Sequence, residues 1–159
     1  MILKSFEFQK INLNLNKFIL LYGKNNGFKN QVTSILKKKQ TNILNYDEKE
    51  ILENENEFIE SFFSTSLFSN EKLIIIKRAT DKILNVINKI SVKDLENKVI
   101  IVAENLEKKS KLRSFFEKNN NFFCIPFYPD TDETLSRLAF DYAKRKKISI
   151  SRSDINLIT

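Results

Sequence analysis

The chain has 159 residues, of which 42% are hydrophobic and 30% charged, and its formal net charge is +7. This length suits one full domain, or one domain and the start of another, with a core large enough to fold without disulfides. The single cysteine excludes an intrachain disulfide and fits a reducing compartment, and the absence of histidine excludes histidine-based triads and most zinc sites. No run approaches the ~18 apolar residues of a membrane span, and MILKSFEF is not a signal peptide, so we expect a cytoplasmic protein.

The N-terminal part of the chain predicts a strand, a turn with glycines and a helix. Residues 1–8 are a candidate edge strand, and 17–22 (KFILLY) form a continuous apolar run, which is typical of a strand covered on both faces. Both glycines of the chain, Gly23 and Gly27, follow this run. A helix over 30–39 comes next, with a basic end that suits a helix C-terminus. Its expected inward residues are Val32, Ile35 and Leu36.

The middle of the chain repeats the alternation of strand and helix. Residues 41–46 predict a short strand, 47–63 an amphipathic helix, 73–77 and 99–103 two buried strands, and 108–118 a further helix. Such alternation indicates an α/β fold in which helices flank a parallel sheet. The residues expected on the buried stripe of the helix over 47–63 are Ile51, Leu52, Phe58, Ile59, Phe62 and Phe63. Those of the helix over 108–118 are Leu112, Phe115 and Phe116.

A domain boundary is expected near the two prolines. Residues 122–127 predict the last strand, and Pro126 and Pro129 lie at its end, where proline cannot continue a central ladder. The acidic sequence DTDE then begins a helix, and SRSD, a capping-box variant, begins a second one. We therefore expect an α/β domain over 1–128 and the beginning of a helical domain over 129–159.

The glycine loop matches a phosphate-binding loop only in outline. A working loop has the pattern G-x-x-x-x-G-K-[ST], whose N–H groups hold phosphates and whose hydroxyl binds Mg²⁺. Here Gly23 and Gly27 are four residues apart, Lys29 is displaced by one position, and Asn30 replaces the hydroxyl. We therefore expect a degenerate loop with no nucleotide cofactor, no metal ion and no catalytic residue. Both glycines would serve a sharp turn that favours positive φ.

Leu67 and Phe68 form an apolar pair outside the predicted stripe of 47–63. They follow Ser64-Thr65-Ser66 and precede a polar turn. From the residues alone, two interpretations stay open. The pair either caps the core, or it is a short apolar wedge offered to a partner at a helix end.

Several segments in one order resemble the delta subunit of the bacterial DNA polymerase III clamp loader. They are KFILLYGKNNGFKN, STSLFSNEKLIIIKR and KVIIVAENLEKKSKLRSFFEK, followed by a helix and KKISIS. The resemblance runs the full length of the chain. It implies an AAA+-type, P-loop-like α/β domain without a working ATP site over 1–128, then the start of a small helical lid domain over 129–159, with a C-terminal collar domain missing. It also implies a subunit without catalysis of its own, in a polymerase assembly whose sibling subunits hydrolyse ATP.

The resemblance further implies a site and partners. In that family a helix end bearing Ser-Leu-Phe inserts into the hydrophobic cleft of the ring-shaped sliding clamp and favours the open ring for loading onto DNA. By motif, Ser66, Leu67 and Phe68 would make this contact, with Thr65 where the family often has a larger apolar residue. The implied partners are the sliding clamp and, mainly through the missing domain, the gamma/tau and delta prime subunits, with DNA met indirectly.

Two other functions stay open. The strand-glycine-lysine order also suits a small active P-loop NTPase, which ATP binding would reveal. The net charge and the run Lys144-Arg145-Lys146-Lys147 also suit a basic nucleic-acid-binding module, although such a run equally suits the solvated end of a helix.

Overall fold

The structure is a computed structural model that describes residues 1–159 except 39, 65–70, 93–96 and 159. The chain divides into two compact units, Met1–Phe127 and Tyr128–Thr159. Among the described residues, no helix is both long and apolar enough to cross a membrane. The helices of the first unit are the 3₁₀ helices η1 (Ser5–Lys10) and η2 (Asp81–Ile83) and the α-helices α1 (Asn26–Lys37), α2 (Glu48–Glu53), α3 (Glu55–Phe63), α4 (Leu84–Ser91) and α5 (Lys111–Lys118).

Five parallel strands form the sheet of the first unit, in the order β2-β3-β4-β1-β5. The two strands β1 and β5 are buried along their whole length, as their continuous apolar runs predict. The prediction of an α/β fold with a parallel sheet flanked by helices is confirmed. The strands are β1 (Phe18–Tyr22), β2 (Ile43–Asp47), β3 (Leu73–Ala79), β4 (Lys98–Ala103) and β5 (Phe122–Pro126).

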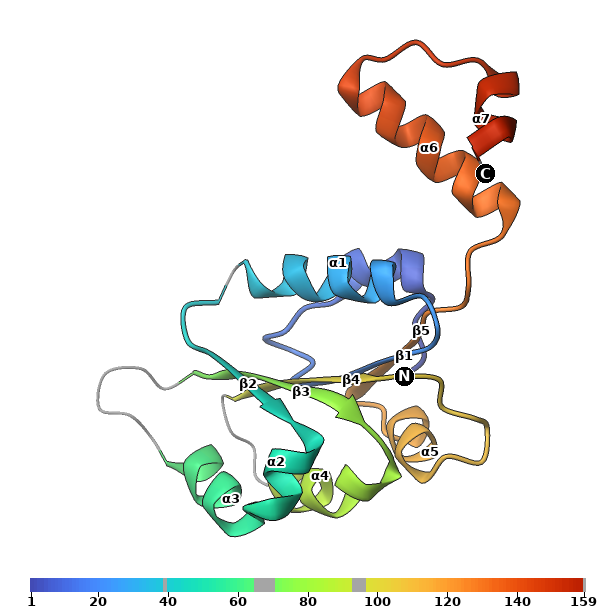
Figure 1. Ribbon diagram of the computed structural model, residues 1–159. Coiled ribbons are helices and arrows are strands. Elements are labelled where there is room, and N and C mark those ends of the chain that lie inside the picture. Colours follow the sequence, from blue (N-terminus) through green and yellow to red (C-terminus); the bar gives the residue numbers. More distant parts are fainter. Residues whose placement is uncertain (39, 65–70, 93–96, 159) are drawn as a thin grey trace. The chain divides into compact units, whose positions relative to one another are not determined.

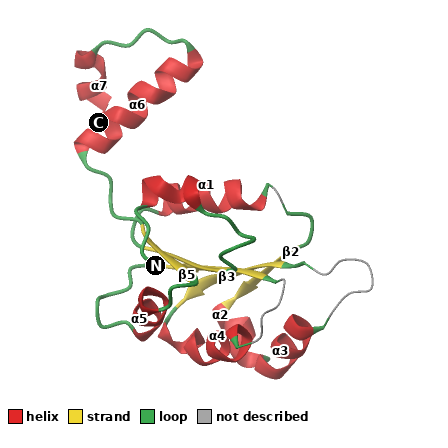
Figure 2. Cartoon of the chain, turned by 180° about the vertical axis from the view of Figure 1, so that it is seen from behind, coloured by secondary structure: helices red, strands yellow, loops and turns green. Residues whose placement is uncertain are grey.

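Helices cover the two faces of the sheet unequally (Figure 1 and Figure 2). The helix α1 lies over one face, while α2, α3, α4 and α5 lie over the other. Alternate residues of β1 point into the two cores: Ile19 and Leu21 pack on the side of α1, and Leu20 and Tyr22 on the side of the four helices. Because both faces are covered, neither set of alternate residues meets water.

The helix predicted over 30–39 begins earlier than expected. It starts at Asn26 because the side chain of Asn25 accepts a hydrogen bond from Phe28 N at 3.0 Å and so caps the helix. Val32 and Leu36 are buried, as expected, but Ile35 is 37% exposed. Ile35 therefore lies at the margin of the buried stripe and not within it.

The single helix predicted over 47–63 is two helices. Asp47 and Glu50 form a capping box that starts α2, and the helix ends at Glu53 because the next residue, Asn54, has a φ of −129°, which is not helical. A second helix, α3, follows at once. The six predicted apolar residues nevertheless pack against the same core, with Ile51, Phe58 and Phe62 buried and Leu52, Ile59 and Phe63 partly buried.

The edge strand predicted over 1–8 is wrong in most of its length. Only Ile2 makes a strand-like bridge, which is parallel and joins it to Cys124 of β5. The chain then turns into η1, where Lys4 N donates to the Glu7 carboxylate at 3.2 Å. A local side-chain hydrogen bond thus replaces the strand ladder at this point.

The sequence reading missed the helix α4. Its apolar residues Val86, Ile87 and Ile90, together with Ile83 just before it, are all fully buried beneath the sheet. Their spacing of three, four and seven is the amphipathic helix pattern. The signal was therefore present in the sequence.

The second unit contains two helices, α6 (Asp132–Lys146) and α7 (Arg152–Ile158). Thr131 starts α6 by accepting a hydrogen bond from Thr134 N at 3.3 Å, and Lys147 ends it in the left-handed conformation with φ 57°. Among the side chains of this unit that the structure describes, the buried apolar ones are Ala143 and Ile155. That this unit begins a lid domain stays a prediction.

Candidate functional site

The loop between β1 and α1 is built around Gly23. Its φ is +124°, a conformation that side-chain-bearing residues rarely adopt, and a Cβ at this position would lie 2.2 Å from the Phe127 carbonyl oxygen. Gly23 N donates to the carbonyl of Glu104 at 2.9 Å. The loop therefore packs directly against the backbone that follows β4 and β5, and only glycine fits there.

Gly27 does not have the role expected from the sequence. It lies in the first turn of α1, it is not among the positive-φ residues, and a Cβ there would meet only the Asn25 side chain, at 3.8 Å. The expectation that both glycines serve a positive-φ turn is thus correct for Gly23 and wrong for Gly27. The physical reason is that the helix begins before Gly27, so the sharp turn is already complete.

Five backbone N–H groups of this loop and the first turn of α1 donate to the protein itself. Gly23 N and Asn25 N donate to carbonyls outside the loop, on Glu104 and Phe127. Inside the loop the acceptors are the Lys24 carbonyl for Asn26 N, the Asn25 side chain for Phe28 N and the Asn25 carbonyl for Lys29 N. In a phosphate-binding loop these donors point at the ligand. Here they hold the turn together.

Lys29 is turned inward. It is 2% exposed, and its Nζ donates to the Ala103 carbonyl at the end of β4, at 2.7 Å. Burial lowers the pKa of Lys29, because the charged ammonium loses water, and the nearby negative charge of Glu104 opposes that effect in part. In this geometry the ammonium bonds to the sheet's own backbone.

A groove of about 300 Å³ lies beside Lys29, along α1 and the carboxyl ends of β3 and β4. At the end of β3, where a nucleotide site would need a carboxylate to hold Mg²⁺, the groove is lined by the basic residues Lys77 and Arg78. Among the described residues that line the groove, the one carboxylate is that of Glu104, which follows β4. Arg78 pairs with the carboxylate of Asp47. Within the described part of the chain, no group of three or more His, Cys, Asp or Glu side chains is placed to hold a metal ion.

Two carboxylates at this edge of the sheet serve backbone groups of the protein. Asp81 accepts hydrogen bonds from the Ser110 hydroxyl, at 2.6 Å, and from Leu112 N in the first turn of α5, at 3.0 Å. It thus supports the N-cap of α5, which is Ser110. Glu48 accepts from Thr80 N at 2.7 Å. Sequence reasoning missed both, because no local pattern indicates a partner about thirty residues away along the chain.

The four predicted clamp-contact residues, Thr65, Ser66, Leu67 and Phe68, lie outside the described residues. Their role stays a prediction. The structure does describe both flanks, since α3 ends at Phe63 and β3 begins at Leu73. On the first flank, the Lys72 ammonium donates to the Ser64 carbonyl at 2.9 Å.

Comparison with protein-family models gives no match, and comparison with curated proteins gives none. Solved structures do resemble the chain. The Bacillus subtilis DNA clamp loader delta protein (YqeN) superposes with a TM-score of 0.67 at 15% identity, over 96% of this chain and 50% of that one. Domain III of the Thermotoga maritima replication initiation protein DnaA gives 0.51 at 14% identity, over 97% and 72%, and a DNA replication initiation factor gives 0.50 at 16%, over 96% and 52%.

These likenesses, all at low sequence identity, show that the chain shares its α/β fold with a DNA clamp loader delta protein and two DNA replication initiation proteins. The chain spans about half the length of the clamp loader delta protein that it resembles.

Proposed function

We propose that this chain is the N-terminal part of a clamp-loader delta subunit, which binds the sliding clamp through Ser66, Leu67 and Phe68, with Thr65 beside them. The observation that carries the proposal is the likeness to the clamp loader delta protein over 96% of the chain, with a TM-score of 0.67 against 0.51 and 0.50 for the two initiation proteins. On this proposal the protein acts in the cytoplasm. Its other partners are sibling clamp-loader subunits, and it meets DNA indirectly.

The geometry of the glycine loop supports a subunit without ATP hydrolysis. Five N–H donors of the loop, those of Gly23, Asn25, Asn26, Phe28 and Lys29, bond to protein acceptors. Lys29 Nζ bonds to the Ala103 carbonyl, and Lys77 and Arg78 stand at the end of β3, where a metal-binding carboxylate would be needed. A nucleotide would have to displace these bonds before it could be held. ATP hydrolysis then belongs to other subunits of the assembly.

The two apolar side chains can supply only part of the binding free energy. Burying a Leu and a Phe contributes roughly 3–6 kcal/mol together, while association costs about 4–15 kcal/mol. Surrounding surface must therefore contribute to clamp binding. Opening the ring further requires tighter binding to the open than to the closed form, because equal affinity for both shifts no equilibrium.

The direct test is the affinity of the chain for the purified sliding clamp, measured by surface plasmon resonance. We expect Leu67→Ala with Phe68→Ala to weaken binding by at least about 100-fold, since the removed burial exceeds two factors of ten in affinity. The thermal midpoint should be nearly unchanged. If the double variant unfolds, the two residues belong to the core and the proposal is wrong.

A matched control uses the same two residue types at another exposed place. Phe6 and Leu15 are 63% and 75% exposed. Phe6→Ala with Leu15→Ala removes one Phe and one Leu, as the test variant does, and should leave clamp affinity within about twofold of the original. An equal loss in both variants would mean that general surface hydrophobicity, and not the proposed pair, drives binding.

Calorimetric titration with ATP and Mg²⁺ separates this proposal from an active P-loop NTPase. We expect no binding heat, because five of the loop's N–H donors and the Lys29 ammonium are bonded within the protein. Micromolar affinity for ATP would contradict the proposed role of the loop and favour the NTPase.

A further inference from the structure

The last turn of α3 is held by a buried lysine from the sheet. Lys72, directly before β3, is 8% exposed, and its Nζ donates to the carbonyls of Ser61 at 2.8 Å and Ser64 at 2.9 Å. A longer contact of 3.3 Å reaches the Ser64 hydroxyl. The last carbonyls of a helix have no partner within the helix and carry partial negative charge. An ammonium therefore satisfies this end in both hydrogen bonding and charge.

Asn97, directly before β4, holds the same turn from the other side. Its side-chain N–H donates to the Phe62 carbonyl at 2.7 Å, and its side-chain oxygen accepts from Lys72 N at 3.1 Å. Asn97 is 6% exposed. The carbonyls of Ser61, Phe62 and Ser64 are thus all bonded to two side chains at the amino ends of β3 and β4.

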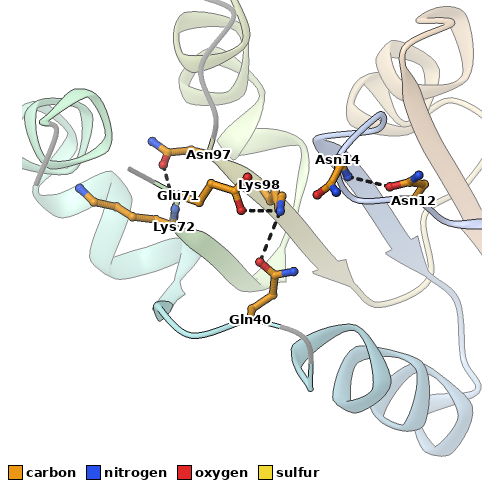
Figure 3. A network of polar contacts seen from close by, with 7 residues as sticks. All are labelled: Asn12, Asn14, Gln40, Glu71, Lys72, Asn97 and Lys98. Atoms are coloured by element: carbon orange, nitrogen blue, oxygen red, sulfur yellow. Dashed lines mark hydrogen bonds and ion pairs between the residues drawn. The ribbon is translucent and has the colours of Figure 1, made fainter. Parts of the chain in front are cut away.

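Figure 3 shows a second group of polar contacts next to Asn97 and Lys72, at the amino ends of β3 and β4. In this group the Lys98 ammonium donates to Glu71 at 2.7 Å and to Gln40 at 3.5 Å. Lys98 N also donates to the Lys72 carbonyl at 2.8 Å. The two residues that bound the undescribed stretch 65–70 are Ser64 and Glu71. Both are therefore bonded to the same cluster of buried side chains, which comes from two neighbouring strands.

A buried lysine is costly compared with an apolar side chain, so its placement here calls for a reason. The core beneath α3 does not supply one, since Phe58 and Phe62 already fill it. What the ammonium does is to fix the end of α3 against the sheet, where the chain enters the residues proposed to meet the clamp. A contact made by a few side chains depends on such fixed placement, because ordering them on binding lowers affinity.

We propose that Lys72 and Asn97 are positioning residues for clamp binding: they hold the end of α3, from which the chain continues into the proposed contact residues, and they do not touch the clamp themselves. This inference rests on the proposed function. It adds two residues that no sequence motif indicates.

The first test does not need the clamp. Hydrogen exchange measured by mass spectrometry should be faster in Lys72→Met than in the unmodified protein for the peptide that covers the end of α3, where Ser64 N is bonded to the Glu60 carbonyl at 2.9 Å. Peptides from α1 should be unchanged. Unchanged exchange at the end of α3 would overturn the inference, because Lys72 would then not hold that turn.

The second test is clamp affinity, with a matched variant as control. Lys72→Met should weaken binding by about 10- to 30-fold, which corresponds to losing a well-placed, buried charge at a helix end. Asn97→Ala removes a neutral hydrogen bond to the Phe62 carbonyl and should weaken binding by about 2- to 12-fold. Lys29→Met removes another buried ammonium, which lies at the carboxyl end of β4, and should bind within about twofold of the original. Equal losses in Lys72→Met and Lys29→Met would indicate a general stability effect and overturn the inference.

A double-mutant cycle distinguishes positioning from direct contact. In the variant that already carries Leu67→Ala and Phe68→Ala, Lys72→Met should weaken the residual binding by less than about twofold. The reason is that Lys72 acts through the Leu67 and Phe68 side chains, which this variant lacks. A full additional loss would mean that Lys72 contacts the clamp itself. If the unmodified chain does not bind the clamp, the proposed function is wrong and this inference falls with it. If it binds and Lys72→Met binds equally well, only the inference is wrong.

Discussion

Replacing each glycine by alanine tests the role that the structure assigns to the glycine loop. Gly23→Ala places a Cβ 2.2 Å from the Phe127 oxygen and 2.9 Å from the Phe127 nitrogen, in a backbone with φ +124°. Contacts this short cannot persist, so the backbone must move. The groups that would move are those of the hydrogen bonds from Gly23 N to Glu104 and from Phe127 N to Tyr22.

The cost can be estimated from these contacts. A residue forced into a glycine-only conformation costs on the order of 1–3 kcal/mol, and a weakened backbone hydrogen bond about 0.5–1.5 kcal/mol. We expect Gly23→Ala to lower the free energy of unfolding by about 2–4 kcal/mol. For a chain of this size that corresponds to a fall of roughly 5–15 °C in the thermal midpoint.

Gly27→Ala should act in the opposite direction. Gly27 lies in the first turn of α1, and a Cβ there would make only an ordinary contact with the Asn25 side chain, at 3.8 Å. Alanine therefore removes backbone freedom from the unfolded chain without a clash. We expect a gain of about 0.5–1 kcal/mol. Urea unfolding followed by far-ultraviolet circular dichroism measures both variants. If both alanines destabilise to a similar extent, or if Gly23→Ala is tolerated, the assignment of the turn to Gly23 alone is refuted.

Two further predictions concern charged groups near this loop. Burial disfavours the ionised Asp81 carboxylate, but hydrogen bonds from Ser110, Leu112 and Lys111 outweigh it and lower the Asp81 pKa. Asp81→Asn should therefore cost about 0.5–2 kcal/mol at neutral pH, and urea unfolding should show the cost present above pH ~3.9 and fading as the pH falls through the lowered pKa. Burial lowers the pKa of the Lys29 ammonium, so the unfolded chain holds the Lys29 proton more tightly than the folded chain does. Raising the pH from about 7 to about 10 should therefore increase the stability of the original protein relative to that of Lys29→Met. For either residue, a difference in unfolding free energy between the original protein and the variant that does not change with pH would contradict the stated direction of the pKa shift.

The sequence predicted the sheet better than the helices. Strands with both faces covered have no solvent-facing positions, so runs such as 17–22 and 99–103 stand out in the sequence as continuous apolar stretches. Helix limits depend on caps. The helix predicted over 47–63 is divided at Asn54, because the backbone of Asn54 is not helical. The helix predicted over 30–39 begins earlier, at Asn26, because the side chain of Asn25 caps it there.

The candidate site divides in the same way. The sequence was enough to predict that the glycine loop departs from a working phosphate-binding loop, since the spacing of Gly23, Gly27 and Lys29 is local information. It could not predict that Lys29 bonds to Ala103, 74 residues away along the chain. It also could not distinguish Gly23 from Gly27, because the clash that requires glycine comes from Phe127, on a different strand connection.

By itself, then, the sequence determined the parallel α/β architecture, because burial on both faces of a sheet demands continuous apolar strands. Only the tertiary structure decided which polar groups meet. Lys72 and Asn97 are 25 residues apart, and Asp81 and Leu112 are 31 apart, yet each pair shares a hydrogen bond. The order of the strands brings such residues together, and that order follows from how all the helices pack on the two faces and not from any one segment.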